Sequence, residues 1–149
     1  MKLFKQVTLN KIVVMGRETF ESLPGKQPLK ERINIVLSKN GNFDDDRIIA
    51  CRSLEELFIE LKKYSNDDIF IIGGESIYSQ LLSYCSEAYI TKINKTYTAD
   101  KYFVNLDKEI NWNQISQSEL KTYNNVEYCF GKYVNNKIHS RLRKNIIYM

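Results

Sequence analysis

Residues 12–23, IVVMGRETFESL, indicate a strand, a turn and a helix in immediate succession. The β-branched run IVVM ends at Gly16, and Thr19, Phe20 and Leu23 then recur at helical spacing. A strand that leads directly into a helix is the first half of a crossover unit, in which the helix packs on the sheet before the chain returns. This stretch therefore predicts an α/β fold.

The same alternation continues on the C-terminal side of this stretch. Strands are predicted over residues 33–37 (INIVL) and 48–50, and a helix runs from the N-cap Ser53 to about residue 64. Residues 69–72 (IFII) are apolar on both faces, as in a strand that helices cover on each side. The pattern predicts a mixed, mainly parallel central sheet flanked by helices.

The last part of the chain favours hairpins over crossovers. Strands are predicted over 87–93, 112–117 and 126–134, while the helical period fades after Lys101. We therefore expect a C-terminal antiparallel hairpin to close the sheet. The tail 137–149, KIHSRLRKNIIYM, has no clear period and is expected to be loosely ordered. All of residues 1–149 are assigned to a single domain.

The composition fits one compact cytosolic domain. The chain has 149 residues, 43% of them hydrophobic, which suffices for one buried core. A net charge of +4 suits an anionic small molecule better than a DNA duplex. No apolar run approaches the roughly 20 residues of a membrane span. Three widely spaced cysteines and one histidine imply neither a disulfide framework nor a metal site.

Two glycine turns follow predicted parallel strands. Gly73–Gly74 separates residues 69–72 from a helical stretch, and Gly16 separates IVVM from its helix, with Arg17 adding a cation. Bare amides at such turns can hold a phosphate, although glycine serves equally well in a tight turn without a ligand. Two anion sites on one sheet edge would suit a dinucleotide that lies across the carboxyl ends of the strands.

Two further polar residues have both a functional and an ordinary interpretation. Arg32 directly precedes the strand 33–37 and could hold a carboxylate through two parallel hydrogen bonds, or it could be a solvated charge. Thr91 lies within the strand 87–93, where a hydroxyl could serve a site or simply bond to the backbone.

Five ordered blocks of this sequence resemble dihydrofolate reductase. They are TLNKIVVMGRETFES, LPGKQPLKERINIVLS, FIIGGESIYSQLL, YITKI and ADKYF, with a weaker echo in VEYCFGKY. That family reduces 7,8-dihydrofolate to 5,6,7,8-tetrahydrofolate by hydride transfer from NADPH. The resemblance therefore implies a cytoplasmic oxidoreductase of one-carbon metabolism and tetrahydrofolate biosynthesis. It also implies binding of dihydrofolate and antifolates, and a monomer if the chain is complete, with no nucleic-acid or membrane partner.

The resemblance assigns a role to each matched position. Residues of the cofactor site would be Gly16, Arg17, Glu18 and Thr19 at the phosphates and amide, Ser38, Lys39 and Arg52 near the adenosine, and Gly73, Gly74, Glu75, Ser76, Ile77 and Tyr78 around the pyrophosphate and nicotinamide. Residues of the substrate site would be Phe4, Lys5, Ser22 and Leu29 at the pterin and benzoyl groups, Arg32 at the glutamate carboxylate, and Thr91 at the pterin amino group and the catalytic acid.

The family pattern begins before the present sequence does. Its first strand, a loop with glycine and tryptophan, and an acidic residue would all precede Met1, so we expect no catalytic acid in the chain as given and impaired activity. Glu18 and Glu21 belong to the cofactor side. The missing strand would be central, and burial of four to six of its side chains is worth on the order of 10 kcal/mol, against a domain stability of about 5–15 kcal/mol. A start codon further upstream is the favoured explanation, and a degenerate remnant is the other.

Three alternative functions compete with the reductase. The absent acid supports a non-catalytic remnant that binds folate and NADPH. A pyrimidine reductase of the riboflavin pathway has the same fold, but the context of Arg32 and the block TLNKIVVMGRETFES favour folate. A nucleic-acid binder would rely on the basic cluster Arg141, Arg143 and Lys144, which lacks interleaved aromatic residues and is therefore expected to be solvated.

Overall fold

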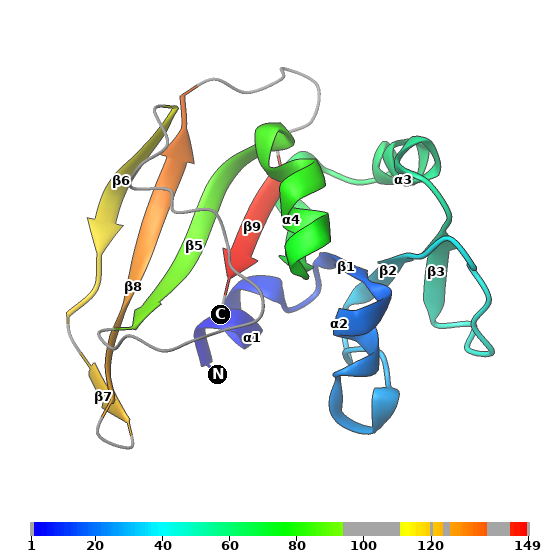
Figure 1. Cartoon of the computed structure of the whole chain (residues 1–149), viewed down its shortest axis with the longest axis horizontal. Coiled ribbons are helices and arrows are strands. Elements are labelled where there is room, and N and C mark those ends of the chain that lie inside the picture. The colour runs from blue at the N-terminus through cyan, green and yellow to red at the C-terminus, as the bar shows by residue number, and fades with distance from the viewer. Residues whose placement is uncertain (1, 94–110, 120, 124–125, 137–143, 149) are drawn as a thin grey trace.

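The computed structural model describes residues 2–93, 111–119, 121–123, 126–136 and 144–148 (Figure 1). Its helices are α1 (Lys2–Thr8), α2 (Arg17–Glu21), α3 (Leu54–Leu61) and α4 (Glu75–Leu81), with 3-10 turns η1 (Pro24–Lys26), η2 (Asn66–Asp68) and η3 (Leu82–Tyr84). Its strands are β1 (Ile12–Gly16), β2 (Ile33–Leu37), β3 (Ile48–Cys51), β4 (Ile69–Gly73), β5 (Cys85–Ile93), β6 (Trp112–Gln117), β7 (Lys121–Tyr123), β8 (Val126–Asn135) and β9 (Lys144–Tyr148).

The strands form one sheet in the order β3-β2-β1-β4-β9-β5-β8-β6, with β7 beside β8. Strands β1 to β4 pair in parallel, whereas β8 pairs antiparallel with β5, β6 and β7. The predicted α/β sheet, mainly parallel with an antiparallel C-terminal part, is confirmed. The family block ADKYF lies outside the described residues.

Strand β1 is buried on both faces, which explains its continuous apolar run. Ile12 and Val14 belong to a core cluster that includes α3 and α4, whereas Val13 and Met15 pack with Phe20 of α2 in a second cluster. Successive side chains of a strand point to opposite faces, so these two clusters cover the two sides of the sheet. The strand therefore ends, at Gly16, between two layers of helix.

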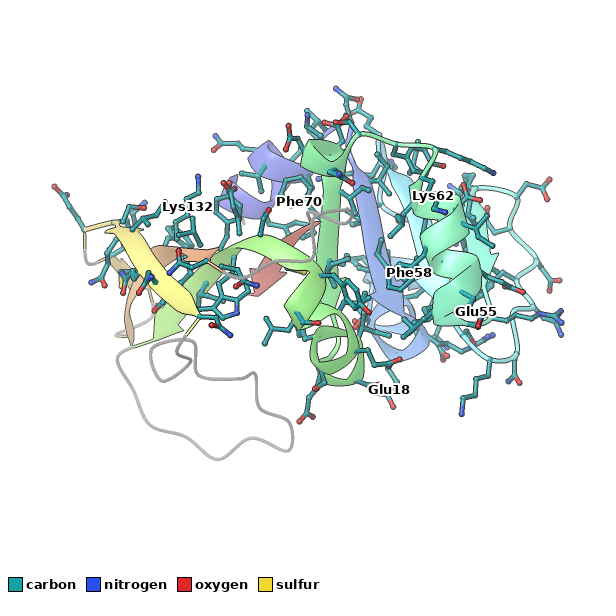
Figure 2. All side chains as sticks on the ribbon, turned by 90° about the horizontal axis from the view of Figure 1, so that it is seen from above. Glu18, Glu55, Phe58, Lys62, Phe70 and Lys132 are labelled. Atoms are coloured by element: carbon teal, nitrogen blue, oxygen red, sulfur yellow. The ribbon has the colours of Figure 1, made fainter. Side chains whose placement is uncertain are left out.

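Helix α3 has the capping signature that its sequence predicted. The Ser53 hydroxyl accepts a hydrogen bond of 3.2 Å from the backbone N–H of Glu56, which satisfies one of the free donors of the first turn. Phe58 lies on the side of the helix that faces the strands, and its ring packs 5.1 Å from that of Tyr84 (Figure 2). The helix ends at Leu61, and a turn follows in which the N–H of Tyr64 donates to the Leu61 carbonyl.

Strand β9 lies between β4 and β5 and runs parallel to both. Figure 1 shows it beside β5. Ile146 pairs with Ile71 on one side and with Ala88 on the other. In the hydrogen-bonded order of the described strands, β9 alone joins the half that contains β1–β4 to the half that contains β5–β8.

The structure differs here from the expected loose tail and from the expected gap at the centre of the sheet. A strand occupies that central position, and it comes from the C-terminal part of the chain. Periodicity missed it because the run NIIY is too short to show a period, and its two pairing partners are distant in sequence. Residues 137–143 of the tail lie outside the described part.

The described residues contain no helix long and apolar enough to cross a membrane, and no cluster of three or more His, Cys, Asp or Glu side chains that could hold a metal. Cys51, Cys85 and Cys129 are all buried, and none of the three forms a disulfide.

Candidate functional site

The carboxyl ends of β1 and β4 lie side by side, and each leads directly into a helix. The two strands pair in parallel, with Met15 opposite Gly73. Helix α2 begins at Arg17, and α4 begins at Glu75 after the Gly73–Gly74 peptide. The sequence prediction that both glycine turns lie on one edge of the sheet is therefore confirmed.

The glycines at these turns allow a close approach between the two crossover units. A Cβ at Gly16 would lie 3.0 Å from Cγ1 of Ile77, and one at either Gly73 or Gly74 would lie 3.3 Å from the hydroxyl of Thr19. Gly73 also has a φ of 132°, which side-chain-bearing residues rarely adopt. The two turns thus form a stretch of bare backbone, called here the glycine cradle, in which a side chain would press against Ile77 or Thr19.

Arg17, directly after β1, adds a positive charge at the carboxyl ends of the strands. Arg17 donates from Nη1 to the Ser38 hydroxyl at 3.2 Å and from Nη2 to the Asn42 carbonyl at 3.3 Å. Its guanidinium carbon lies 4.5 Å from the centre of the Phe43 ring, and its Nε lies 3.3 Å from a carboxylate oxygen of Glu21. Arg17 is therefore held against the segment 38–43 that follows β2.

Arg52 also lies against this segment. A Cβ at Gly41 would lie only 2.6 Å from Nε of Arg52, and the Ser38 N–H donates to the Cys51 carbonyl at 2.9 Å. Lys39 lies within this segment. The structure therefore brings together Arg17, Ser38 and Arg52, which are distant in sequence and which the resemblance placed around one end of the cofactor.

Arg32 lies at the opposite end of the parallel strands from the glycine turns, near the ring of Phe4. Arg32 directly precedes β2, and its Nε donates to the Thr8 hydroxyl of α1 at 3.2 Å. Nη1 donates to the Lys30 carbonyl at 2.8 Å, and the guanidinium carbon lies 6.0 Å from the centre of the Phe4 ring. Partial burial lowers the pKa of Arg32 from its usual value, an effect that Glu31 opposes. Arginine nevertheless stays charged at neutral pH.

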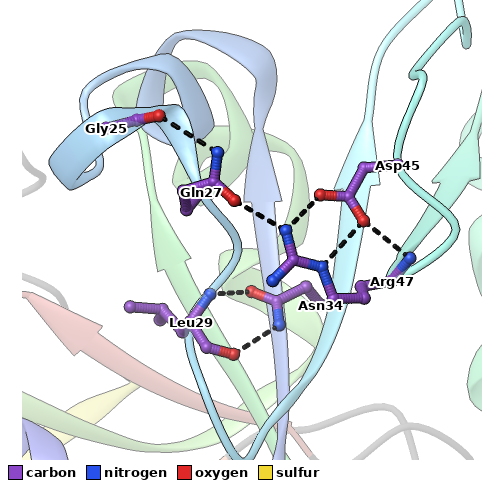
Figure 3. Close-up of polar contacts among 6 residues, drawn as sticks. All are labelled: Gly25, Gln27, Leu29, Asn34, Asp45 and Arg47. Carbon is purple, nitrogen blue, oxygen red and sulfur yellow. Dashed lines mark hydrogen bonds and ion pairs between the residues drawn. The ribbon is translucent and has the colours of Figure 1, made fainter.

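The loop before Arg32 is fastened by the side chain of Asn34 (Figure 3). The Leu29 N–H donates to Oδ1 of Asn34 at 3.0 Å, and Nδ2 of Asn34 donates to the carbonyls of Leu29 at 2.9 Å and Arg32 at 3.1 Å. Asn34 is only 1% exposed. Leu29 itself packs against the core cluster beneath α2.

A surface network steadies the start of the same loop (Figure 3). Arg47 donates to Oε1 of Gln27 at 2.6 Å and to both carboxylate oxygens of Asp45, while Gln27 donates to the Gly25 carbonyl. These hydrogen bonds from Arg47 lower the pKa of Asp45 to about 2.

Thr91 lies toward the same edge as Gly73. Strands β4 and β5 both run parallel to β9, and Ile146 is level with Ile71 and Ala88. Gly73 and Thr91 lie shortly after those two pairing positions, so both approach the carboxyl end of the sheet. Thr91 pairs with Phe130 of β8, and its side chain lies outside the described part.

The remaining predicted residues differ in their exposure. Ser22 closes α2 by donating from its hydroxyl to the Thr19 carbonyl at 2.6 Å. Ile77 and Tyr78 are buried under the glycine turns. Four others are exposed, and Figure 2 shows one of them, Glu18, projecting outward from the ribbon; the four are Lys5, Glu18, Glu75 and Ser76.

Sequence reasoning missed Thr8, Asn34 and Phe43. A polar residue within the apolar run INIVL was the available signal for Asn34. Thr8 and Phe43 carry no such signal, because their contacts with Arg32 and Arg17 join segments that are distant along the chain.

Comparisons with known proteins found a matching family model and several similar proteins. A family model described as dihydrofolate reductase matches residues 1–135. The chain is 35% identical to a bifunctional dihydrofolate reductase-thymidylate synthase of Plasmodium chabaudi over 146 residues, which cover 92% of this chain and 25% of that protein. It is 41% identical to a dihydrofolate reductase of Buchnera aphidicola subsp. Acyrthosiphon pisum over 103 residues, 69% of this chain and 62% of that protein. A dihydrofolate reductase of Buchnera aphidicola subsp. Baizongia pistaciae is 32% identical, with 93% of this chain and 80% of that protein covered. The chain thus spans a quarter of the first of these relatives and less than two thirds of the second.

Proposed function

Because this chain belongs to the dihydrofolate reductase family, we propose that it binds NADPH and 7,8-dihydrofolate and transfers hydride to give 5,6,7,8-tetrahydrofolate. The observation that carries this proposal is the separation of the two candidate sites. The glycine cradle lies at the carboxyl ends of the strands, and Arg32 lies at the amino end of β2. A five-residue strand spans roughly 16 Å, so a substrate that reaches from Arg32 toward a cofactor bound at the glycine cradle must be elongated and end in an anion.

Folate has this shape, with a flat pterin at one end and a glutamate carboxylate at the other. The pyrimidine intermediates of riboflavin synthesis lack the glutamate that Arg32 would bind, and the matching relatives named above are dihydrofolate reductases. The reductase of the riboflavin pathway is therefore not favoured. Antifolates that carry the same glutamate would use the same guanidinium.

The residues present fit a dinucleotide cofactor. Gly16, Gly73 and Gly74 present backbone without side chains at the carboxyl ends of β1 and β4, and bare backbone of this kind can accept a pyrophosphate. Arg17 and Arg52 flank the segment 38–43, where a 2′-phosphate would meet two cations. When bound, NADPH would supply the hydride. The chain's own part would be to align the cofactor with the pterin near Gly73 and Thr91.

We expect the chain to bind NADPH more tightly than NADH, because only NADPH offers a 2′-phosphate to Arg17, Lys39 and Arg52. A charge-assisted hydrogen bond contributes about 1.5–3 kcal/mol, which corresponds to roughly tenfold to a hundredfold in affinity. Fluorescence titration with the two nucleotides measures the ratio. Equal affinities would overturn the assignment.

The matched variants for this test are Arg52→Gln and Arg47→Gln. Arg52→Gln should lower the preference for NADPH and leave NADH binding unchanged. Arg47 is held by Asp45 and Gln27 and is not assigned to the cofactor, so Arg47→Gln should keep the wild-type ratio.

We expect Arg32→Leu to weaken folate binding at least tenfold and to leave NADPH binding unchanged, since the glutamate tail alone needs a guanidinium there. Lys30→Ala is the control, because Lys30 contributes its backbone carbonyl to Arg32. Titration with folate and with methotrexate measures the effect. If Arg32→Leu binds both as tightly as the wild type, folate is not the ligand of this end of the site.

The resemblance further supports action in the cytoplasm and, if the chain is complete, action as a monomer. It also supports the interpretation that no residue of 1–149 is the proton-donating acid, so we infer that this chain turns over slowly.

A further inference from the structure

Two of the three buried polar side chains in the described part of the chain form hydrogen bonds to the segment 29–32. They are Thr8, which is 0% exposed, and Asn34, which is 1% exposed; the third is Asn135, in β8. Burial of a polar group is costly unless its hydrogen bonds are made. Within the described residues, the side-chain hydrogen bonds of Thr8 and Asn34 are made to α1 and to the segment that carries Leu29 and Arg32.

Thr8 uses its hydroxyl in both directions. The O–H donates to the Phe4 carbonyl at 2.7 Å within α1, so the oxygen keeps a lone pair for Nε of Arg32 at 3.2 Å. The Lys30 carbonyl holds Nη1 of the same guanidinium at 2.8 Å. Because a guanidinium is planar, contacts at Nε and Nη1 together fix the direction in which its other N–H groups point.

Asn34 binds the backbone of the segment 29–32 and not the guanidinium of Arg32. Its amide makes two hydrogen bonds to Leu29 and one to the Arg32 carbonyl, so both ends of the segment are tied to β2. Between them, Glu31 has a φ of 60°, a left-handed conformation that is unfavourable for a residue with a side chain. Such a conformation persists when its surroundings hold it, and the Asn34 amide provides that hold.

We propose that Thr8 and Asn34 are positioning residues for recognition of the substrate's terminal carboxylate. Thr8 sets the plane of the Arg32 guanidinium, and Asn34 fixes the loop that presents Leu29 and Arg32. This inference rests on the proposed function, since the carboxylate is that of the folate glutamate. Both residues act on the tail of the substrate and on neither the pterin nor the cofactor.

The first test replaces Thr8 by valine, which has nearly the same shape but lacks the hydroxyl. Thr8→Val should weaken binding of folate about tenfold, because the charge-assisted contact is lost and the guanidinium is free to turn. Binding of NADPH and of pterin, which lacks the aminobenzoylglutamate, should stay unchanged. Thr8→Ser keeps the hydroxyl and should restore folate binding to the wild-type value.

The second test separates positioning from general support of the fold. In the Arg32→Leu background, Thr8→Val should cause no further loss of folate affinity, because its effect passes through the guanidinium. Asn34→Asp keeps the acceptor for the Leu29 N–H but loses both donors, and it should weaken folate without weakening pterin. Thermal unfolding of each variant identifies any that fail to fold. If Asn34→Asp does not fold, the Thr8 variants alone test the positioning role.

The outcomes distinguish this inference from the function on which it rests. If the wild-type chain does not bind folate, the proposed function itself is wrong. If folate binds and Arg32→Leu weakens it, but Thr8→Val does not, only the positioning role is wrong. Equal losses of folate and pterin in Thr8→Val, or an additive loss in the double variant, would likewise contradict it.

Discussion

Replacement of Ile146 by proline is expected to lower the free energy of unfolding by about 3 kcal/mol or more. Ile146 is in the middle of β9, between Ile71 of β4 and Ala88 of β5. Proline has no backbone N–H and is not tolerated in a strand that is paired on both sides. Because a typical domain is stable by only about 5–15 kcal/mol, such a loss would leave little folded protein.

The control is Ile115→Pro in β6, the last strand in the order of the sheet. The register of β6 against β8 shifts between Gln114 and Ser116, so Ile115 is at a bulge, and it is 56% exposed. Proline is accommodated at edges and bulges, so we expect a loss of less than about 1 kcal/mol. Urea unfolding of the two variants measures the difference. If Ile146→Pro unfolds at the wild-type midpoint, β9 does not pair between β4 and β5 in solution.

The second large effect concerns turnover. We expect the 149-residue chain to oxidise NADPH with dihydrofolate about 10²–10⁴-fold more slowly than the same chain extended upstream by a segment with an acidic residue. Hydride arrives from the cofactor, but the pterin nitrogen must also gain a proton in a site shielded from bulk water. The resemblance assigns no residue of 1–149 to this step. The rate of the short chain should therefore rise as the pH falls, because solution acid supplies the proton.

Two carboxylates within the chain provide the control for this prediction. Glu21 lies 3.3 Å from Nε of Arg17, and Glu18 is exposed on α2 at the cofactor side. At saturating NADPH, where a change in cofactor affinity does not affect the rate, Glu18→Gln and Glu21→Gln should leave the turnover of the short chain unchanged. Near-normal turnover by the short chain, abolished by either substitution, would show that one of these groups donates the proton. In the extended chain, replacement of the added acid by its amide should return turnover to the level of the short chain.

Sequence periodicity was sufficient where an element is defined by its own residues. Strand β2 runs over the predicted residues 33–37, and the Ser53 cap begins α3 as predicted. Strand β9 was not predicted, because this short apolar run forms a strand by pairing with residues 70–71 and 85–90, which are distant in sequence. Helix α1 escaped because a seven-residue helix has too little length for a clear period.

Some features of the candidate site were likewise predictable from local sequence, and others were not. The glycine turns at Gly16 and Gly73 were predictable, since each directly follows an apolar run and precedes a helical one. The stacking of Arg17 on Phe43 and the hydrogen bond from Arg32 to Thr8 were not, because each joins residues whose proximity depends on the finished sheet. The assigned binding roles come from the family resemblance and stay predictions.

The position of β9 also sets the order in which this protein can fold. Asn145 must find Phe70, and Lys144 must find Cys85, although these partners lie far apart in the sequence. Contacts so distant in sequence form slowly because the loop between them must close first. Until then β4 and β5 each present an open edge, with unpaired backbone groups that another chain could bind. The folding chain is therefore most exposed to aggregation and to chaperone capture before β9 inserts between β4 and β5.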